Sequence, residues 1–585
     1  MKEISFSTIF KLIIKNKSAL IYGQIFTLLA ILASIPIPIL LPLLVDEVLL
    51  NKPSFVVNNI NDLFGSGSAF YYIALVGFGV ITLRFLYYIL SVLSTKVFTK
   101  IAKYVTFMIR KRLLEHLEIV SMNEYETLGS GTITSNLITD VNTLDSFIIT
   151  TISRFVASVL TLVAVSVVLF MMDPILGIFI LIFQPLIMFV SKKMSRRVGK
   201  LKKEENQSIA DFQEDVSETL ELFGQIKASD KEKYFFDQAL KKADTIQETS
   251  NRFGYKSVAY ERLSYTLFLI FYELLRMGGL LLVAYSNLSI GMMFAMFGYI
   301  WFITSPVQDI LSMQYSFASA KTAIERLNTI LTLKTESSGT KTINENNLTI
   351  EAKNLNFSYD KPILKSISLS IAARSKIALI GASGSGKTTL AQVLAGFYEK
   401  ESGDIFYNNI SIDELNKRSL RKKVFLVLQM PILFNATLRF NITMGDDSID
   451  DKTIHQALHK AQLAEMIANM PKGLDTVVGR HGIRLSGGQR QRISIARMLV
   501  VNPSVVIFDE STSALDVHTE VALQNALESV LKDKTVITIA HRLSTVKNAD
   551  TIYVLENGTI VQHGTHKELE EKEGHYREFI QRQLV

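Results

Sequence analysis

The sequence predicts a polytopic α-helical membrane domain followed by an α/β domain, and three observations support this fold class. Long apolar runs are concentrated in the first half of the 585-residue chain, of which 48% is hydrophobic. From Leu348 onward, short apolar runs alternate with helical segments, as in an α/β domain. A glycine-rich loop at 381–389 lies between a strand-like and a helix-like run, which is the setting of a phosphate-binding loop.

Six apolar runs predict six transmembrane helices, because a helix needs about 20 residues to cross the hydrocarbon core. The runs lie at about 18–45, 70–93, 150–171, 175–190, 265–285 and 292–310. The first run contains Pro36, Pro38 and Pro42. Proline inside a span frees backbone carbonyls that neighbouring helices must satisfy. We therefore expect a kinked first helix that packs in a bundle or lines a cavity.

The positions of Lys and Arg predict the orientation in the membrane. Basic residues gather before the first run, after the second and after the fourth, whereas the opposite loops hold a single lysine, Lys52. Both termini and the α/β domain are thus expected in the cytoplasm, as in a multi-pass protein of a bacterial inner membrane. The net charge of +7 follows from this topology, and no base-reading module accompanies it, so we expect no nucleic-acid partner.

Two charged segments, 94–148 and 191–264, keep helical periodicity. They are expected to extend the membrane helices into the cytoplasm and to turn at tips near 126–131 and 222–225. The alternative is a soluble helical hairpin that does not connect the membrane domain functionally with the cytoplasmic domain. The expected organisation is a membrane domain at 1–332 with these two tips, a polar linker at 333–347 and a nucleotide-binding domain at 348–585.

The loop at 381–389 reads Gly-Ala-Ser-Gly-Ser-Gly-Lys-Thr-Thr. Backbone N–H groups of such a loop, together with a helix N-terminus, cradle phosphates. Lys387 is expected to reach the β- and γ-phosphates of a bound nucleotide, and the Thr388 hydroxyl to bind Mg²⁺. The predicted phosphate-binding residues are Gly381, Ser383, Gly384, Ser385, Gly386, Lys387, Thr388 and Thr389.

Four further residues predict hydrolysis of a nucleoside triphosphate. Asp509 follows a buried strand at 505–508, where a carboxylate can hold the metal, and Glu510 is next to it, placed to activate water. Gln429 follows an apolar run and is a neutral candidate ligand for the metal and the water. His541 ends another apolar strand, where ligands bind in an open parallel sheet, and is expected to contact the γ-phosphate. A purely structural histidine is the alternative.

The stretch 485–489 reads Leu-Ser-Gly-Gly-Gln, and with this second motif the chain resembles the ATP-binding-cassette (ABC) exporter family. The resemblance spans nearly the whole chain, in the half-transporter form with the membrane domain first. It implies that Tyr359 stacks on adenine, that Gln429 lies in the Q-loop, that 513–516, ending at Asp516, is the D-loop, and that His541 is the switch histidine. It also makes the two tips coupling helices.

By the same resemblance, Ser486, Gly487, Gly488 and Gln489 of one subunit complete the ATP site of a second copy of the chain, which implies a homodimer. The implied function is ATP-driven export of an amphipathic cargo (a drug-like compound, a lipid or a peptide) by alternating access. Two alternatives stay open: a nucleotide-gated channel or regulator, and one half of a heterodimeric exporter.

Three charged residues lie within predicted spans, where charge is costly. Arg84, Glu273 and Arg276 either contact cargo or pair structurally, and Glu273 is expected to pair with one of the two arginines. The segment 476–482 departs from the family pattern because both usual acidic positions are lost, one of them to Arg480. Arg480 is therefore expected to meet a carboxylate of a tip: Glu124, Glu126, Glu218 or Glu221. The chain has no cysteine, which excludes disulfides and thiol chemistry.

Overall fold

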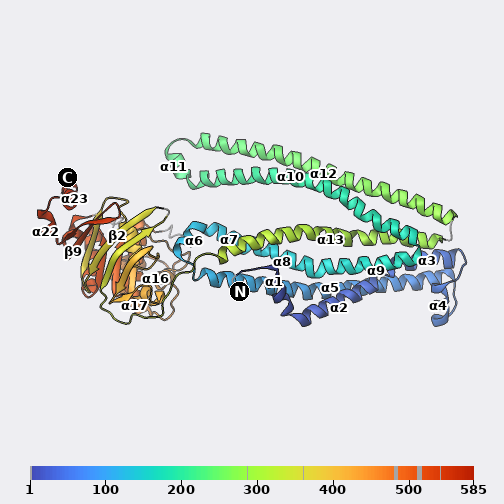
Figure 1. Cartoon of the computed structure of the whole chain (residues 1–585), viewed down its shortest axis with the longest axis horizontal. Coiled ribbons are helices and arrows are strands. Elements are labelled where there is room, and N and C mark those ends of the chain that lie inside the picture. The colour runs from blue at the N-terminus through green and yellow to red at the C-terminus, as the bar shows by residue number, and fades with distance from the viewer. Residues whose placement is uncertain are drawn as a thin grey trace. The chain divides into compact units, whose positions relative to one another are not determined.

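The computed structural model describes residues 3–285, 288–359, 361–479, 485–509, 517–540 and 542–584 (Figure 1). The chain divides into two compact units. The helical unit comprises Met1–Glu115 and Gly131–Thr332, and the C-terminal unit comprises His116–Ser130 and Leu333–Val585. The short segment His116–Ser130 thus belongs with the C-terminal unit, although it lies in the first half of the sequence.

The helical unit consists of long helices joined by short turns. Three of them exceed 45 residues and include parts of the two charged segments that the sequence indicated. Its α-helices are α1 (Phe6–Ile14), α2 (Lys17–Ser34), α3 (Ile37–Leu44), α4 (Phe55–Phe64), α5 (Ala69–Leu117), α7 (Ser130–Ser135), α8 (Val141–Ile149), α9 (Val156–Met172), α10 (Pro174–Glu221), α11 (Phe223–Ala228), α12 (Glu232–Tyr285) and α13 (Ile290–Leu331). The short π-helical segments Val45–Leu49, Asn136–Asp140 and Thr150–Phe155 extend or join them.

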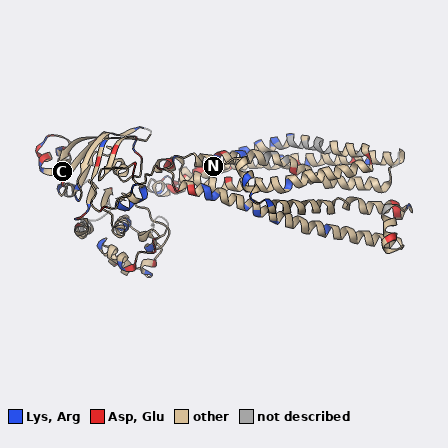
Figure 2. Cartoon of the chain, turned by 60° about the horizontal axis from the view of Figure 1, so that its bottom comes forward, with Lys and Arg blue, Asp and Glu red and all other residues tan. Residues whose placement is uncertain are grey.

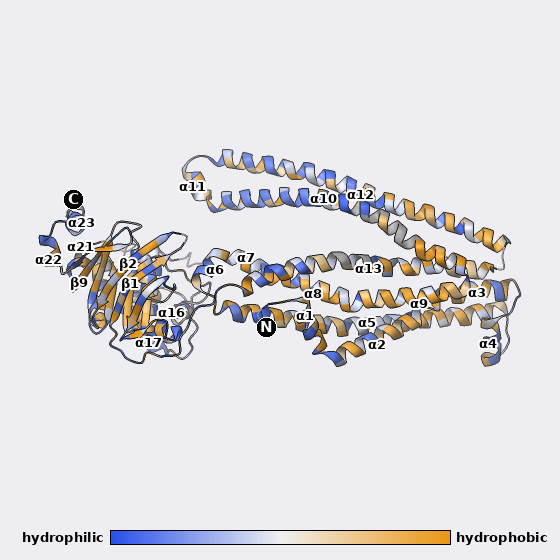
Figure 3. Cartoon of the chain, in the orientation of Figure 1, coloured by the Kyte–Doolittle hydropathy of each residue, from blue (hydrophilic) through white to orange (hydrophobic). Residues whose placement is uncertain are grey.

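Apolar spans run through this unit. Among the described residues, five stretches are long and apolar enough to cross a membrane: Lys17–Leu49, Ala69–Leu117, Ser130–Met172, Glu232–Tyr285 and Ile290–Ile310. The other predicted span, at 175–190, lies at the start of α10, where the structure does not describe many of the side chains. Figure 3 shows α10 and α12 changing from hydrophilic beside α11 to hydrophobic at their far ends. The predicted helical membrane domain is confirmed.

The prediction of a kinked first span is confirmed. The helix is interrupted between α2 and α3, at Ile35 and Pro36, and Pro42 lies inside α3. The Tyr299 hydroxyl on α13 donates a hydrogen bond to the Ile35 carbonyl at 2.6 Å. A neighbouring helix therefore satisfies a carbonyl at the break, as proline in a membrane helix requires.

Of the several ion pairs in the helical unit, one involves charges within a predicted span and another involves a buried carboxylate. Arg276 Nη1 lies 3.0 Å from each carboxylate oxygen of Glu273, one turn away on α12, so the expected pairing of Glu273 is confirmed. The second pair was not expected: Arg326 on α13 forms a two-pronged contact with the buried Asp140, at 2.6 and 3.1 Å. Figure 2 shows few charged residues along much of the helical unit, and Lys and Arg gather toward the end of this unit that carries the N-terminus.

The described residues of the C-terminal unit form two sheets. The antiparallel sheet has the order β2-β1-β4-β5, and the other has the order β10-β9-β3-β8-β7-β6. In the second sheet all strands except the edge strand β10 are parallel. The strands are β1 (Ile350–Ser358), β2 (Pro362–Ile371), β3 (Lys376–Gly381), β4 (Ser402–Tyr407), β5 (Ile410–Ser411), β6 (Val424–Val427), β7 (Val505–Asp509), β8 (Thr535–Ile539), β9 (Thr551–Glu556) and β10 (Thr559–Gly564).

Helices cover these sheets and form a second, mainly helical core. Leu355, Leu379 and Leu394 belong to a buried cluster that joins both sheets and α14. A separate cluster, which includes Leu458 and Ile493, packs helices against β6 and β7. The helices are α6 (Met122–Leu128), α14 (Lys387–Leu394), α15 (Lys417–Lys423), α16 (Leu438–Thr443), α17 (Asp451–Lys460), α18 (Ala464–Ala468), α19 (Gly487–Val501), α20 (Val517–Leu531), α21 (Leu543–Lys547), α22 (His566–Glu571) and α23 (His575–Leu584).

The segment that carries α6 is tied to the chain just after α13. Val120 pairs with Thr335 in an isolated β-bridge. The Ser121 amide donates to the Lys334 carbonyl at 2.9 Å, and the Glu336 amide to the Ile119 carbonyl at 2.7 Å. The residues at the start of the predicted linker therefore have defined backbone partners in the segment just before α6.

Candidate nucleotide site

The sheet order brings the predicted site residues to one edge. The parallel strands β3, β8, β7 and β6 are neighbours, so their carboxyl ends meet on the same side of the sheet. The glycine-rich loop follows β3, Asp509 ends β7 and Gln429 follows β6. Ligands of open parallel sheets bind at this edge. Glu510, Asp516 and His541 lie outside the described residues.

The glycine-rich loop has the backbone of a phosphate cradle. Gly384 and Gly386 adopt φ of +79° and +99°, which residues with a side chain rarely adopt. A Cβ on Gly386 would also lie 3.0 Å from Leu364 Cδ2, so the start of α14 packs closely against β2. The Lys387 ammonium donates to the Gly381 and Ala382 carbonyls, both at 3.0 Å, and is thereby held beneath the loop.

One buried hydroxyl of this loop, that of Ser385, lacks a hydrogen-bond partner among the described residues. The Ser385 side chain is buried, and no hydrogen-bond partner of its hydroxyl is found in the described part of the chain. A buried hydroxyl without a partner is unfavourable. A phosphate oxygen in the loop would supply an acceptor, so the loop fits an anion. Ser383 and Gly384 are exposed, Thr389 is half-buried, and Thr389 follows Thr388 in the first turn of α14.

A hydroxyl and a carboxylate adjoin the loop. The Thr388 hydroxyl donates to Asp509 Oδ1 at 3.2 Å, and the Asp509 side chain is buried at the end of β7. An oxygen pair of this kind, next to a phosphate cradle, suits Mg²⁺, which prefers oxygen ligands and is bound through one or two carboxylates together with phosphates. The residues present therefore fit the metal.

Gln429 is exposed in the loop after β6, and its backbone carbonyl accepts a hydrogen bond from α19. Gln491 Nε2, on α19, donates to the Gln429 carbonyl at 3.1 Å. Gln491 is buried and its role was not predicted from the sequence. A glutamine inside a helix gives no local signal that it binds a loop 62 residues earlier in the chain.

The motif at 485–489 forms the N-terminus of α19. Ser486 caps the helix: its hydroxyl accepts from the Gln489 amide at 3.1 Å, and Gln489 Oε1 accepts from the Ser486 amide at 2.8 Å. This capping box satisfies two amides. The Gly487 and Gly488 amides, in the first turn, have no intrahelical acceptor, as at any helix start. The motif thus presents N–H groups and a helix N-terminus, which favour an anion.

Tyr359 follows β1, in the turn to β2, and its side chain is exposed. Ser358 pairs with Pro362 at the start of β2, the strand that also contacts Gly386. The turn therefore lies beside the phosphate cradle. The Tyr359 ring packs edge-on against Phe357 and Tyr398, with ring centres 4.9 and 5.5 Å apart. Sequence reasoning missed Tyr398, which no motif marks.

Arg480 lies outside the description, so its contact with a tip carboxylate stays a prediction. One of the four candidate acceptors has a different partner: Glu126 on α6 accepts a hydrogen bond from the Tyr398 hydroxyl at 2.8 Å.

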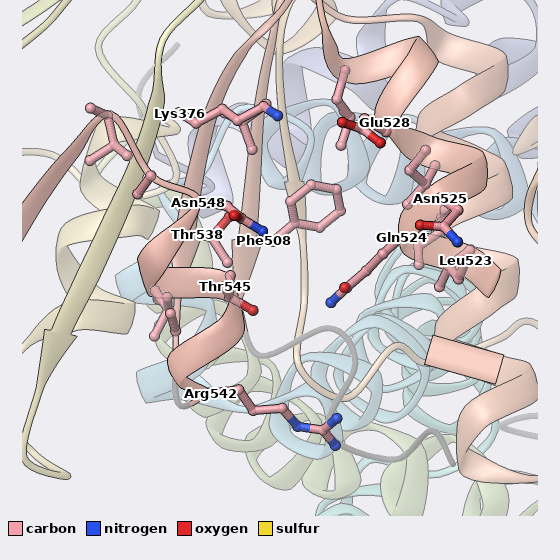
Figure 4. Close-up of a pocket in the computed structure, with 18 residues that line it drawn as sticks. Lys376, Phe508, Leu523, Gln524, Asn525, Glu528, Thr538, Arg542, Thr545 and Asn548 are labelled. Atoms are coloured by element: carbon pink, nitrogen blue, oxygen red, sulfur yellow. The ribbon is translucent and has the colours of Figure 1, made fainter. Parts of the chain in front are cut away.

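A cavity of about 450 Å³ lies between α20 and strands β3, β7 and β8 of the parallel sheet. Figure 4 shows Gln524, Asn525 and Glu528 of α20 across from Phe508 and Thr538 of the sheet. The lining includes none of the residues of the glycine-rich loop. The lining does include Ala540 and Arg542, which flank His541 in the sequence.

Together, the apolar helices and the phosphate cradle on a parallel sheet define a membrane-bound P-loop nucleotide hydrolase. Two family models match the chain: the ABC transporter transmembrane region over residues 20–307, and the ABC transporter over 364–513. The chain belongs to the ABC transporter family, and within it to the ATPases that are coupled to transport.

Similar proteins are exporters by name. The putative multidrug export ATP-binding/permease protein YgaD of Bacillus subtilis (strain 168) is 31% identical, with 81% of this chain and 83% of that protein covered. The ATP-dependent lipid A-core flippase of Haemophilus influenzae (strain 86-028NP) is 32% identical, with 82% and 83% covered. Among solved structures, a bacterial Atm1-family ABC exporter with ATP bound matches with a TM-score of 0.78 at 23% identity, covering 99% of each chain. This last likeness shows the fold, and the chain is a membrane protein of the ABC exporter type.

Proposed function

We propose that the protein exports an amphipathic cargo, such as a drug-like compound, a lipid or a peptide, by alternating access powered by ATP. The observation that carries the proposal is the convergence of the glycine-rich loop, Asp509 and Gln429 at one sheet edge, in a chain with apolar spans. The relatives named for multidrug export and for lipid A-core flipping support this class of cargo.

ATP would lie across the glycine-rich loop. The loop amides and Lys387 would bind the β- and γ-phosphates, Ser385 would donate its hydroxyl to a phosphate oxygen, and Tyr359 would stack on adenine. Thr388, Asp509 and Gln429 would hold Mg²⁺, which neutralises charge on the transferred phosphoryl group. A base that stacks on an aromatic ring is held without a specific hydrogen bond.

Hydrolysis requires a positioned water. Glu510 comes directly after Asp509, at the carboxyl end of β7, and is proposed as its general base. His541 comes two residues after the end of the adjacent strand β8, from which it would contact the γ-phosphate. Both roles are assigned from chain position at the sheet edge.

The motif at the start of α19 is proposed to act on a second copy of the chain. Its glycine amides and Ser486 would close over the phosphates held by the partner's loop, with Asp516 nearby, so that two shared sites form in a homodimer. The membrane helices leave much apolar surface uncovered by the chain itself. Only 11% of the apolar stretch of α5 and 17% of that of α12 are buried, which supports an assembly in lipid.

We further propose that the protein lies in a bacterial inner membrane with both termini and the C-terminal unit in the cytoplasm. The concentration of Lys and Arg on one side of the predicted spans supports this orientation. The tips at α6 and α11 would then be cytoplasmic and would transmit movement between the nucleotide and membrane domains.

ATPase kinetics of purified protein in lipid test the nucleotide chemistry. Glu510→Gln is expected to keep ATP affinity while slowing turnover about 10²–10⁴-fold, the range for a positioned acid–base group. Lys387→Ala is expected to weaken nucleotide binding instead, because it removes the charge that faces the phosphates. Near-normal turnover in Glu510→Gln would refute the assignment of the base.

A further inference from the structure

Three aromatic rings form a cluster at the position where adenine is proposed to stack. The rings of Phe357, Tyr359 and Tyr398 lie 4.9–5.6 Å apart, and Tyr359 meets both others edge-on. Tyr359 is 41% exposed, whereas Tyr398 is 7% exposed. Tyr398 is therefore the buried support against which the exposed Tyr359 ring stands. Edge-to-face packing of this kind favours a defined ring orientation.

The hydroxyl of Tyr398 points to the first tip. It donates a hydrogen bond to Glu126 Oε2 at 2.8 Å, and Glu126 lies in α6. Burial raises the pKa of the Tyr398 phenol, and the neighbouring Tyr359 phenol and Glu126 carboxylate raise it further. The phenol therefore stays protonated at neutral pH and remains the donor. A hydrogen bond to a charged acceptor is stronger than one between neutral groups.

The segment His116–Ser130 has a second side-chain contact with the rest of the C-terminal unit, and this contact does not involve the aromatic cluster. Glu118 forms an ion pair with Arg418, and both side chains are largely exposed. Exposed pairs contribute little stability. This pair is therefore a matched control: it also links the segment to the domain, but it does not touch the ring that faces adenine.

We propose that Tyr398 is a positioning residue that links the adenine-facing ring of Tyr359 to α6 through the Glu126 carboxylate. When adenine stacks on Tyr359, the cluster is held in one arrangement, and the Tyr398 hydroxyl then holds α6 in place. By reciprocity, an α6 that keeps this hydrogen bond favours binding of the base. The inference rests on the proposed function, because it requires that Tyr359 bind the adenine of ATP.

The linkage is testable by hydrogen exchange of the amides in α6 in the full-length protein in lipid. A non-hydrolysable ATP analogue is expected to slow exchange in α6 of the wild type, and inorganic triphosphate, which lacks the base, is expected to leave it unchanged. Tyr398→Phe keeps the ring but removes the hydroxyl, so the response of α6 to the analogue should be lost. Equal protection by both ligands in the wild type, or a retained response in Tyr398→Phe, would overturn the proposal.

Kinetics provide a second readout. Glu126→Ala and Tyr398→Phe are each expected to raise the KM for ATP about threefold or more, with a smaller change in kcat, because the loss concerns nucleotide binding. The double variant should be no worse than the single ones, since both remove the same bond. Glu126→Gln, whose amide oxygen still accepts the bond, should restore part of the affinity. Glu118→Ala should behave as the wild type.

The outcomes separate this inference from the proposed function. A wild type without ATPase activity would refute the proposed function. An active wild type in which Tyr398→Phe and Glu126→Ala keep the wild-type KM would refute the linkage alone. The same rise in KM in Glu118→Ala would also contradict it, because any loosening of the tip would then have the same effect.

Discussion

At the scale of single residues, a buried asparagine joins the segment after Gln429 to α19, the helix that begins at the 485–489 motif. Asn441 is fully buried in α16. Its side chain exchanges two hydrogen bonds with the Phe434 backbone, at 2.8 and 3.0 Å, and donates to the Thr437 carbonyl at 3.1 Å. Arg497 on α19 donates both to its side-chain oxygen and to its carbonyl.

Asn441→Ala should destabilise the protein strongly. It would leave the Phe434 amide and one arm of the Arg497 guanidinium buried without their acceptor, and an unsatisfied buried group costs about 1–3 kcal/mol. We expect a loss of about 2–4 kcal/mol in the free energy of unfolding, measured by denaturant or thermal unfolding. Asn469→Ala, at an exposed position, is the control and should stay within about 0.5 kcal/mol. Equal stability of the two variants would contradict this network.

The roles of single residues could be predicted where the residue follows a strand. They could not be predicted where the residue forms hydrogen bonds with a segment far away in the sequence. Asp509 and Gln429 were found because each comes at the end of an apolar strand, and the parallel sheet brings such ends together. Gln491, Asn441 and Tyr398 were not found, because their partners are remote in sequence. Their positions depend on packing that no local pattern records.

At the scale of elements, the sequence predicted helices and strands best where a local rule applies. The break between α2 and α3 follows from Pro36. By contrast, α4 was expected as part of a loop. Its first turn is capped by Glu47, whose carboxylate oxygens accept from the Val56 and Val57 amides at 3.0 and 2.6 Å. A carboxylate eight residues before the first residue of the helix is not a local capping signal.

The ion pair on α12 gives a prediction at this scale. Glu273→Gln should harm folding more than Glu273→Gln combined with Arg276→Gln, because the single change leaves an arginine without its carboxylate in a span where charge is costly. The yield and thermal stability of the purified protein in lipid provide the measurement. If Glu273→Gln folds normally and changes only the cargo-stimulated ATPase activity, Glu273 contacts cargo instead.

At the scale of the whole molecule, the sequence indicated a membrane part and a nucleotide part but not how the chain is divided between them. The segment His116–Ser130 belongs to the C-terminal unit, because Val120 and Ser121 pair with the chain after α13. Hydropathy cannot reveal this, since the pairing uses backbone groups. The strand order of the sheet likewise follows from contacts between strands far apart in sequence.

The homodimer is tested by cross-linking, which is practical because the chain has no native cysteine. A chain that carries both Ser486→Cys and Ser383→Cys should form a covalent dimer when ATP is bound to the Glu510→Gln background. Each single-cysteine variant is the control and should form much less. A cross-link that requires a different polypeptide would show a heterodimer instead.

The central claim is that ATP hydrolysis at the sheet edge drives cargo across the membrane. The most direct test is transport in proteoliposomes, with a fluorescent phospholipid and an amphipathic cationic dye as separate probes. The wild type should move at least one probe against its gradient only with ATP and Mg²⁺, and Glu510→Gln should not. Downhill flux of a probe that continues unchanged in Glu510→Gln, with no uphill movement by the wild type, would contradict the claim and indicate a nucleotide-gated channel.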